Sequence, residues 1–389
     1  MAAIGPCLPT SINDAEALLR IAEQQAIDLT VVGPEAPLDA GVADAFRAAG
    51  RPIVGPGKIA AQLECSKVFA KHFMQRHDIP TARFVVHTDL DAALDAVSGR
   101  DFGFPVVVKA DGLAAGKGVV VAQDRAEAEA AVRACLADGA FGAAGATLVI
   151  EECLTGPEVS FFALCDGTRA IALGSAQDHK RAYDDDRGPN TGGMGAFAPS
   201  PLLTPALEQI AMRDIAQRVI DGLKADGSGE YRGFLYISLM LTPTGPKVIE
   251  FNVRFGDPEA QVVLPAIEGS LGNLLMACAN GRLDQAAPVT LSHEKFVGVV
   301  MASGGYPGAM QMGKPISGLD AASAIDDVVV FHAGTRIDGD SVVTSGGRVV
   351  TVVGRGASYR DAMAKAYAGV ECITYDGMEF RRDIGRKAV

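Results

Sequence analysis

The first 78 residues alternate between short apolar runs and longer amphipathic stretches. The apolar runs predict strands at residues 28–32 and 52–55. Helices are predicted around them, at about 13–25 with Ser11 or Asn13 as the cap, from the loop Gly33–Pro37 to about Ala49, and at 59–77. Such alternation indicates a parallel sheet, whose carboxyl-terminal strand ends bind ligands. A doubly wound unit normally opens with a strand and a glycine turn, but here a helix comes first, so this domain is expected to be incomplete.

Residues 80–164 show a different pattern, in which strands dominate. The predicted strands are 83–86, 105–109, 119–121, 147–150 and 158–164, and the predicted helices are 89–97 and 124–137. The strand that ends at Lys109 is joined to the strand at Val119 by a loop with three glycines and a lysine. This arrangement predicts a hairpin flap.

The second half begins with a polar stretch, 175–200, predicted as a long binding loop. A helix is expected at 204–224, then a hairpin of 234–241 with 247–255, and a helix at 268–279. Strands at 297–302, 328–331 and 348–353 and an amphipathic helix at 359–370 predict a small α+β domain at the end of the chain.

One strand, 247–255, carries three polar residues at alternate positions. Glu250, Asn252 and Arg254 are expected to project from one face, with Val248 nearer the strand's start. The opposite face, Ile249, Phe251, Val253 and Phe255, is apolar and is expected to join a core. A carboxylate beside an amide oxygen suits Mg²⁺, and the fork of an arginine binds carboxylates or phosphates. An ordinary half-exposed strand would explain Glu250 alone; the whole array, with Asp257 and Glu259 in the turn that follows, favours a functional site.

Composition narrows the class of protein. The chain has 389 residues, 45 of them glycine, and 48% are hydrophobic, which predicts a globular α/β protein of two to four domains. A net charge of −12 argues against nucleic acid as the main partner. The seven cysteines form no Cys-x-x-Cys pair and no apolar run is long enough for a membrane span, so a cytoplasmic location is expected.

Lys109 and the glycines after it point to phosphate binding. Taken alone, Lys109 is as compatible with a side chain that extends into water, but Gly112, Gly116 and Gly118 permit close backbone approach and Lys117 adds charge. The loop is neither a Walker A motif nor a dinucleotide fingerprint. Further on, the backbone near Cys153 and Leu154 is a candidate to hydrogen-bond the edge of an adenine, and Glu158 is a candidate to accept from ribose hydroxyls. Acidic residues at strand ends are, however, more often simply exposed to solvent.

Six motifs together resemble the ATP-grasp superfamily and, within it, the glycinamide ribonucleotide synthetase (phosphoribosylamine–glycine ligase) family. They run in that family's order over nearly the whole chain: Gly33-Pro-Glu-Ala-Pro-Leu38, Val108-Lys-Ala-Asp-Gly-Leu-Ala-Ala-Gly-Lys-Gly-Val119, Gln177-Asp-His-Lys-Arg181, Gly188-Pro-Asn-Thr-Gly-Gly-Met-Gly195, Val248-Ile-Glu-Phe-Asn-Val-Arg-Phe-Gly-Asp-Pro-Glu259 and Gly304-Gly-Tyr-Pro-Gly308. The family's usual opening, a strand with a glycine-rich turn, has no counterpart here.

The resemblance implies that ATP, glycine and 5-phosphoribosylamine give glycinamide ribonucleotide, ADP and phosphate through glycyl phosphate, in de novo purine biosynthesis. It implies a role for each of the following residues. The catalytic residues would be Arg254, Asp257 and Lys109. ATP would be held by Lys109, Gly116, Lys117, Gly118, Glu151, Glu152, Cys153, Leu154 and Glu158. Glycine and phosphoribosylamine would be held by Arg254, Asp257, Asp178, His179, Lys180, Arg181, Gly192, Gly193 and Met194. Mg²⁺ or Mn²⁺ would be held by Glu250 and Asn252.

The expected fold class is α/β, an ATP-grasp fold with a truncated doubly wound N-terminal domain and a small α+β C-terminal domain. The expected divisions are 1–78 (N-terminal), 79–150 (lid), 151–290 (central, with the metal and substrate sites) and 291–389 (C-terminal). The partners are expected to be small molecules only, and the protein a monomer. The alternative is a nucleotide-binding ATP-grasp protein that has lost acceptor binding or catalysis with the family's opening segment.

Overall fold

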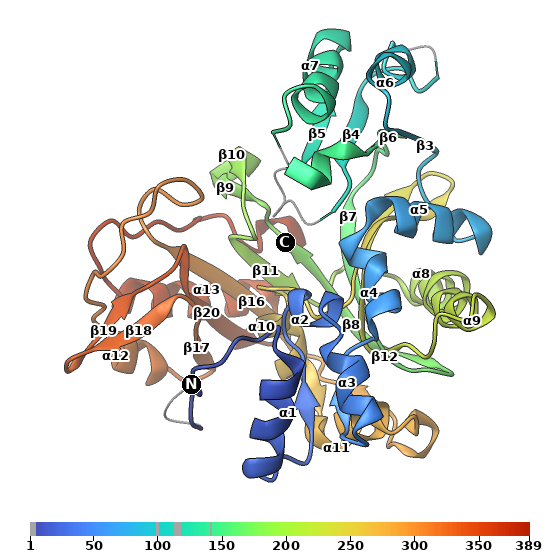
Figure 1. Ribbon diagram of the computed structural model, residues 1–389. Helices are drawn as coiled ribbons and strands as arrows, with labels where there is room; N and C mark the ends of the chain where they lie inside the picture. The colour runs from blue at the N-terminus through green and yellow to red at the C-terminus, as the bar shows by residue number, and fades with distance from the viewer. Residues whose placement is uncertain (1–4, 99–100, 113–117, 141) are drawn as a thin grey trace.

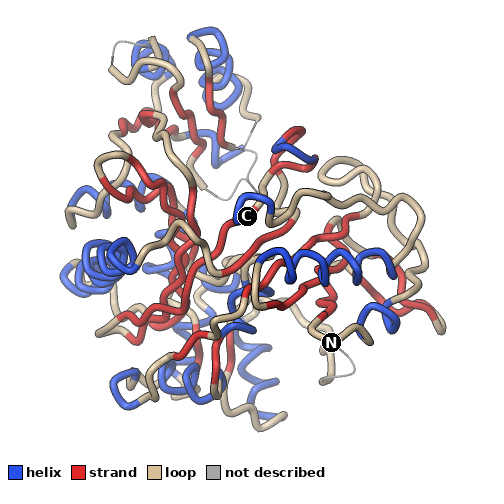
Figure 2. The backbone as a smooth tube through the Cα atoms, turned by 180° about the vertical axis from the view of Figure 1, so that it is seen from behind, coloured by secondary structure: helices blue, strands red, loops and turns tan. Residues whose placement is uncertain are grey.

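The computed structural model describes residues 5–98, 101–112, 118–140 and 142–389. In Figure 1 the N-terminal part is blue and lies below the centre, a lid stands at the top, and the C-terminal part extends to the left. Viewed from behind, the strands of the central and C-terminal parts run together through the middle of the molecule (Figure 2).

The N-terminal part is a small α/β unit. Its elements are α1 (Ala15–Gln24), β1 (Thr30–Val31), α2 (Ala36–Asp39), α3 (Val42–Ala48) and β2 (Ile53–Val54). β1 and β2 pair in parallel, as predicted, with Thr30 opposite Ile53. The predicted cap of the first helix is wrong: the Asp14 side chain, not that of Ser11 or Asn13, accepts the hydrogen bond from the Ala17 amide.

The single helix predicted at 59–77 is in fact two helices, α4 (Lys58–Cys65) and α5 (Lys67–Arg76). Ser66 adopts an extended conformation, and its Oγ accepts a hydrogen bond from the Phe69 amide at 3.0 Å. Ser66 therefore ends one helix and caps the next. The break starts α5 at Lys67, and Lys71 follows one turn later on the same face.

The lid is a four-stranded antiparallel sheet covered by two helices. The strand order is β3-β6-β4-β5. The strands are β3 (Phe84–His87), β4 (Val106–Ala110), β5 (Val119–Ala122) and β6 (Leu148–Glu152), and the helices are α6 (Leu90–Ala96) and α7 (Arg125–Leu136). β4 and β5 form the predicted hairpin. Small apolar residues of both helices and of the strands fill a core that belongs to the lid.

The largest sheet has eight strands in the order β13-β12-β7-β8-β11-β16-β20-β17. It consists of β7 (Glu158–Asp166), β8 (Ala170–Asp178), β11 (Gly195–Ala198), β12 (Arg232–Thr242), β13 (Gly245–Asn252), β16 (Lys295–Ala302), β17 (Val328–His332) and β20 (Arg348–Gly356). The predicted tail strands are thus confirmed as strands, but they are continuous with the central sheet. The junction is the antiparallel pair β11–β16, with Gly195 opposite Val299.

The stretch 175–200 was predicted as a loop, and this prediction is wrong. It contains the end of β8, a two-stranded ribbon of β9 (Arg181–Tyr183) and β10 (Arg187–Asn190), and β11. Its polar, glycine-rich composition hides these strands, because they depend on pairing: β9 and β10 pair with each other, and β11 pairs with β8 and with β16, a hundred residues later.

Helices cover the central sheet, and smaller elements complete the C-terminal part. A continuous helical stretch, α8 (Pro205–Ile210), a π-helical turn (Ala211–Ala216) and α9 (Gln217–Ala225), confirms the predicted helix at 204–224. The others are α10 (Ala260–Val263), β14 (Ile267–Glu268), α11 (Leu271–Ala279), β15 (Thr290–Leu291), α12 (Leu319–Ser323), β18 (Thr335–Asp338), β19 (Ser341–Thr344) and α13 (Tyr359–Cys372).

A bulge in β13 changes which side chains share a face. Ser238 is opposite Glu250, but Leu239 is opposite Val248, so Ile249 is the extra residue. Val248 therefore joins the core that contains Phe251 and Val253, and not the face of Glu250 as predicted. Phe255 lies beyond the strand and packs on a different core, stacked on Phe162 with ring centroids 4.4 Å apart.

No helix in the described part of the chain combines the length and apolar character needed to cross a membrane.

Candidate active site

The polar face of β13 presents Glu250 and Asn252 on the same side of the sheet. Glu250 is exposed and Asn252 is half-buried. Arg254 follows the strand, and its Nη2 donates to Asn252 Oδ1 at 3.2 Å. The predicted alternation of an acid, an amide and a guanidinium is therefore present in the structure.

Two carboxylates of the N-terminal part hold Arg254. Its Nε donates to Glu35 Oε2 at 3.2 Å and its Nη2 to Glu64 Oε1 at 2.9 Å. Glu64 also accepts the Val253 amide at 2.8 Å. Burial raises the pKa of Glu64 to about 7, although the charge of Arg254 opposes the shift. The guanidinium plane is thus fixed from a different part of the chain than the strand that carries it.

A buried cluster of two lysines around Glu151 lies where α5 meets the lid. Lys71 Nζ is 2.9 Å from Glu151 Oε2, and Lys109 Nζ is 3.0 Å from Glu151 Oε1. All three side chains are almost fully buried. Lys71 also donates to Thr81 Oγ1 at 2.8 Å, and Thr81 donates to the Val248 carbonyl, which ties the cluster to β13. Burial lowers the pKa of Lys71 to about 8, and Glu151 opposes this effect.

Lys67 connects this cluster electrostatically to the face of β13. Its Nζ donates to the Gly112 carbonyl at 3.0 Å, at the start of the glycine loop. Burial lowers the pKa of Lys67, the charge of Glu250 acts to raise it, and that of Lys109 lowers it further. The charges of Glu250 and Lys109 therefore both influence the pKa of Lys67.

The residues predicted for adenosine follow β6 into β7. Glu152 accepts from Arg83 Nε at 2.8 Å and from Lys247 Nζ at 3.1 Å. Its burial acts to raise its pKa, but these hydrogen bonds outweigh burial and lower it to about 2. Cys153 and Leu154 lie half-buried in the connection between the two strands, and Glu158, at the start of β7, pairs with Lys180 at 2.9 Å.

The predicted phosphate loop is only partly within the described residues. Gly116 and Lys117 lie outside them. Gly118 is buried, and its carbonyl accepts the Ala110 amide at 2.8 Å, which closes the base of the β4–β5 hairpin.

The segment Gly192–Met194 is held by the C-terminal part. The Gly192 amide donates to Tyr306 Oη at 3.0 Å, and Arg348 Nη1 donates to the Gly192 carbonyl at 2.8 Å. Met194 is buried, and its amide donates to the His179 carbonyl at 2.8 Å. The predicted acceptor residues are therefore joined to β8 on one side and to the C-terminal part on the other.

Arg348 also holds the turn after β13. It donates to the Asp257 carbonyl at 2.6 Å and pairs with the Asp257 carboxylate at 3.2 Å. Asp257 is exposed, whereas Glu259 is buried and accepts from Tyr236 Oη at 3.0 Å. A Cβ at Gly256 would lie 2.4 Å from Glu259 Oε2, so a side chain here would displace this carboxylate. The two acids of the turn thus point to different surroundings.

The four residues Asp178 to Arg181 are not equivalent. Burial raises the pKa of Asp178, which ends β8, and the charge of Lys180 opposes the shift. His179 is buried beside Phe197, with ring centroids 5.9 Å apart. Arg181 is exposed and donates to the Gly188 carbonyl at 2.8 Å across the ribbon.

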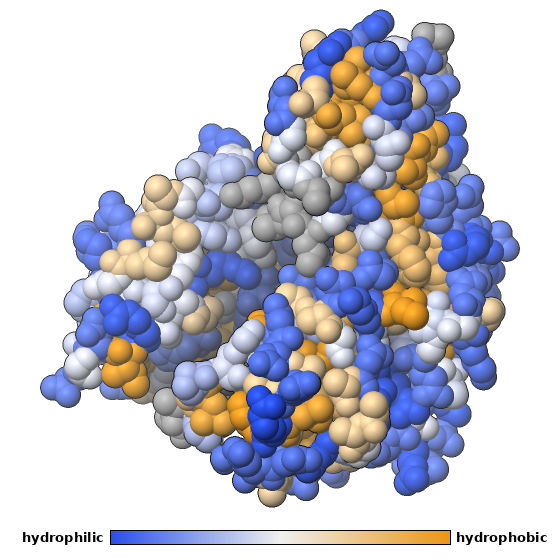
Figure 3. Space-filling model, viewed as in Figure 1, coloured by the Kyte–Doolittle hydropathy of each residue, from blue (hydrophilic) through white to orange (hydrophobic). Residues whose placement is uncertain are grey.

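The arrangement fits a hard divalent ion whose remaining ligands come from a phosphate-bearing substrate. Glu250 and Asn252 supply oxygen donors from one face of one strand. Within the described residues, no group of three or more His, Cys, Asp or Glu side chains could hold a metal by itself. Two protein oxygens completed by phosphates are what Mg²⁺ commonly uses. The surface is hollowed below the lid, and hydrophilic residues predominate around the hollow (Figure 3).

Sequence reasoning missed several residues that the structure brings to this region. They are Glu64, Lys67, Lys71 and Arg348; Glu35 and Tyr306 lie in two of the motifs quoted above but had no predicted role. One signal was available: Lys67 and Lys71 are four residues apart in Ser66-Lys-Val-Phe-Ala-Lys71, on a helix with an apolar face. The others depend on which segments pack together.

Family models match almost the whole chain. They are the phosphoribosylglycinamide synthetase N domain over residues 1–64, the ATP-grasp (A) domain over 65–260 and the C domain over 296–387. The chain is 50% identical over 383 residues to phosphoribosylamine–glycine ligase of Xylella fastidiosa strain Temecula1, covering 98% of this chain and 88% of that one. It is also 50% identical over 378 residues to that of Allochromatium vinosum, covering 97% and 87%.

Comparison with solved structures points to the same family as the sequence comparison. A crystal structure of phosphoribosylamine–glycine ligase from Thermotoga maritima matches with a TM-score of 0.84 and 32% identity, over 97% of this chain and 90% of that one. Biotin carboxylase from Campylobacter jejuni matches with a TM-score of 0.72 and 18% identity, over 94% and 79%, which shows the shared fold alone. With three family models in order and half of its residues identical to those of full-length relatives, the chain belongs to the phosphoribosylglycinamide synthetase family.

Proposed function

We propose that this chain is an ATP-dependent ligase that joins glycine to 5-phospho-D-ribosylamine, giving glycinamide ribonucleotide, ADP and phosphate in de novo purine biosynthesis. The observation that carries the proposal is the convergence of Glu250, Asn252 and Arg254 with the buried lysine cluster around Glu151, which Thr81 ties to β13. Family membership and the relatives' names support the same activity.

In the proposed reaction the glycine carboxylate attacks the γ-phosphorus of ATP, and ADP leaves. The amine of phosphoribosylamine then attacks the carbonyl carbon of glycyl phosphate, forms the amide bond and expels phosphate, with loss of a proton from the amine. No nucleophile of the protein is needed. The protein acts by holding the reactants and neutralising charge, as in other phosphoryl transfers.

The nucleotide half is assigned to the lid and to α5. Lys109, with the loop residues Gly116, Lys117 and Gly118, would meet the phosphates of ATP, and Lys67 joins this set. Both oxygens of Glu151 face lysines, so Glu151 would act on ATP by orienting Lys71 and Lys109. The connection Glu152–Leu154 and Glu158 would hold adenosine.

The metal and substrate half is assigned to β13 and to the segments around it. Glu250 and Asn252 would hold the Mg²⁺ or Mn²⁺ ion, which would neutralise phosphate charge. Arg254 and Asp257 would hold the carboxylate and the amine of glycine. Gly192, Gly193 and Met194 with Asp178, His179, Lys180 and Arg181 would form the acceptor region, in which His179 is buried.

We also propose a domain division, an oligomeric state and a cellular location for this protein. The chain is divided at 78, 150 and 290, although one sheet crosses the last division. The protein works as a monomer, and it is located in the cytoplasm.

The decisive experiment is an ADP-release assay with ATP, Mg²⁺, glycine and freshly made phosphoribosylamine, with each component omitted in turn. The ligase requires all four for turnover, and glycinamide ribonucleotide must form in equal amounts with ADP. ATP binding without glycine-dependent ADP release would instead identify a protein that has kept only nucleotide binding.

A further inference from the structure

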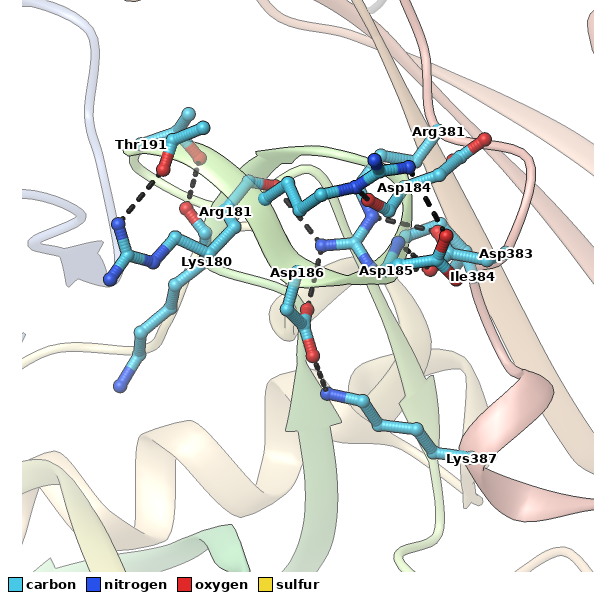
Figure 4. A network of polar contacts seen from close by, with 12 residues as sticks. Lys180, Arg181, Asp184, Asp185, Asp186, Thr191, Arg381, Asp383, Ile384 and Lys387 are labelled. Atoms are coloured by element: carbon cyan, nitrogen blue, oxygen red, sulfur yellow. Dashed lines mark hydrogen bonds and ion pairs between the residues drawn. The ribbon is translucent and has the colours of Figure 1, made fainter.

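The last residues of the chain fasten the β9–β10 ribbon through a buried arginine. Arg381 has a fully buried side chain. Its Nε and Nη2 donate to the two oxygens of Asp383, at 2.8 and 2.7 Å, and its Nη1 donates to Asp186 Oδ1 at 2.9 Å. Nη1 also donates to the backbone carbonyl of Arg181 at 3.1 Å. We call residues 381–387 the C-terminal clamp; Figure 4 shows it against the ribbon.

Each of the three consecutive aspartates in the turn of the ribbon, Asp184 to Asp186, contacts a residue of the clamp. The Arg382 amide donates to Asp184 Oδ1 at 2.7 Å, and the Asp185 amide donates to Asp383 Oδ2 at 2.9 Å. Lys387 pairs with Asp186 at 2.6 Å. Asp185 and Asp186 have φ values of 59° and 53°, a left-handed conformation that costs energy for most residues with a side chain and that aspartate tolerates better than most. The clamp contacts all three aspartates of this turn and so helps to hold its conformation.

Hydrogen bonds to the backbone connect Arg381 and the ribbon to the proposed acceptor residues. Arg381 binds the carbonyl of Arg181, the residue next to Lys180. The Lys180 carbonyl accepts both the Thr191 amide, at 2.7 Å, and Thr191 Oγ1, at 2.9 Å. Thr191 Oγ1 in turn accepts the Gly193 amide at 3.0 Å. A short chain of hydrogen bonds thus runs from Arg381 to Gly193.

We propose that Arg381 is a positioning residue for the acceptor substrate. It fixes the ribbon so that Lys180 and the backbone of Thr191–Gly193 are placed to receive phosphoribosylamine, an inference that rests on the function proposed above. Because its side chain is fully buried and three of its four hydrogen bonds go to clamp or ribbon acids, Arg381 acts through these segments and does not touch substrate. The planar fork is essential, since a lysine cannot donate to Asp383, Asp186 and Arg181 in the same geometry.

Arg381→Lys tests the inference while retaining the buried charge. We expect the KM for phosphoribosylamine to rise about tenfold, because a misplaced binding segment weakens the one substrate that it contacts. The KM values for ATP and glycine should stay within about twofold of wild type. The matched control is Arg355→Lys, which alters another arginine of the C-terminal part, one that pairs with Asp327 away from the ribbon. It should leave all three KM values unchanged.

A purely structural arginine would lower the melting temperature without changing the kinetics of the folded enzyme. All KM values are therefore measured well below the melting temperature of each variant. An unchanged KM for phosphoribosylamine in folded Arg381→Lys, or equal increases for all three substrates, would overturn the proposal.

A second variant covers the case in which Arg381→Lys does not fold. Asp186→Asn removes one acidic partner whose side chain is 42% exposed, so the fold is not at risk. It should raise the same KM about threefold and speed amide hydrogen exchange in residues 181–193 at least about fivefold. A wild-type KM for phosphoribosylamine together with wild-type amide exchange rates in Asp186→Asn would refute the proposed role of the clamp. The exchange measurement needs no activity, so it tests the clamp even if wild-type protein forms no glycinamide ribonucleotide, a result that would refute the proposed function alone.

Discussion

Glu250 is the only carboxylate on the polar face of β13, so it would supply that strand's negative charge to the proposed metal site. Asn252 is neutral and already accepts from Arg254. The residue opposite Glu250 across the ladder is Ser238, a weaker ligand for a hard cation. In the proposed metal site, β13 would therefore supply one anionic ligand.

Glu250→Gln keeps the shape of the side chain and removes its charge. We expect ADP formation to fall at least about 100-fold at saturating ATP, since removing a ligand that stabilises transition-state charge lowers kcat. Excess Mn²⁺ should restore part of the activity. Glu268→Gln, at an exposed position on β14, is the control. Near-normal turnover in Glu250→Gln would contradict the metal assignment.

His179 gives the folded protein a sensitivity to acid. Burial, with the charges of Arg381 and Lys387, lowers its pKa from 6.5 to about 4. Among the described residues neither ring nitrogen has a hydrogen-bond partner. Because the folded-state pKa lies below the unfolded value, this residue's contribution to stability is complete above pH 6.5 and is lost as the pH falls toward 4.

His179→Leu should therefore remove part of the acid sensitivity. Between pH 6.5 and 4 the wild type should lose about 3 kcal/mol more of its free energy of unfolding than the variant, about 1.4 kcal/mol for each pKa unit. Urea unfolding followed by circular dichroism at several pH values measures the difference. Parallel pH profiles for the two proteins would exclude His179 as the source.

Among the elements, β20 and α13 pack more closely than side chains usually allow. A Cβ on Gly354 would lie 2.2 Å from the Ala362 carbonyl oxygen and 2.4 Å from the Ala366 amide nitrogen. The helix therefore rests on the bare backbone of the strand. Any side chain at this position must push α13 away from the sheet.

We expect Gly354→Ala to lower the free energy of unfolding by about 2–3 kcal/mol, because the added methyl overpacks the interface. The control is Gly272→Ala in α11, where nothing lies within 4 Å of the added Cβ. Alanine is a better helix former than glycine, so this control should be neutral or slightly stabilising. Thermal unfolding of the two variants and the wild type measures the effect. Equal melting temperatures for Gly354→Ala and wild type would show that α13 can shift freely.

Elements with regular patterns were predictable, and contacts between distant elements were not. The period of two along β13 identified Glu250 and Asn252, yet nothing local marks Ile249 as the bulge, which depends on the register with β12. Lys71 is two per cent exposed because α5 packs against β6, an encounter of segments eighty residues apart. The strands β9 to β11 escaped prediction because their pairing, not their composition, makes them strands.

At the level of the whole molecule, the C-terminal part belongs to the proposed active site. Arg348 lies at the start of β20 and donates to the carbonyls of Gly192 and Asp257, which come from two separate segments of the central part. One guanidinium thus sets the spacing between the proposed acceptor segment and the proposed glycine-binding turn.

Arg348→Met should lower kcat/KM for both glycine and phosphoribosylamine by about 10- to 100-fold, because both segments lose their shared donor. The apparent affinity for ATP should change little. Arg336→Met is the matched control; Arg336 is exposed on β18, where it pairs with Asp338. A loss confined to one of the two substrates would show that Arg348 supports only one segment.

The eight-stranded sheet also determines how the protein comes apart. Its ladder runs without interruption from β13 to β17, and one apolar cluster includes Phe162 of β7, Phe296 of β16 and Val353 of β20. The C-terminal part therefore cannot melt while the central part stays intact, and calorimetry should record a single heat-absorption peak for the two together. The lid has its own sheet and its own core, so in the described part of the chain it can unfold while the eight-stranded sheet beneath it stays intact.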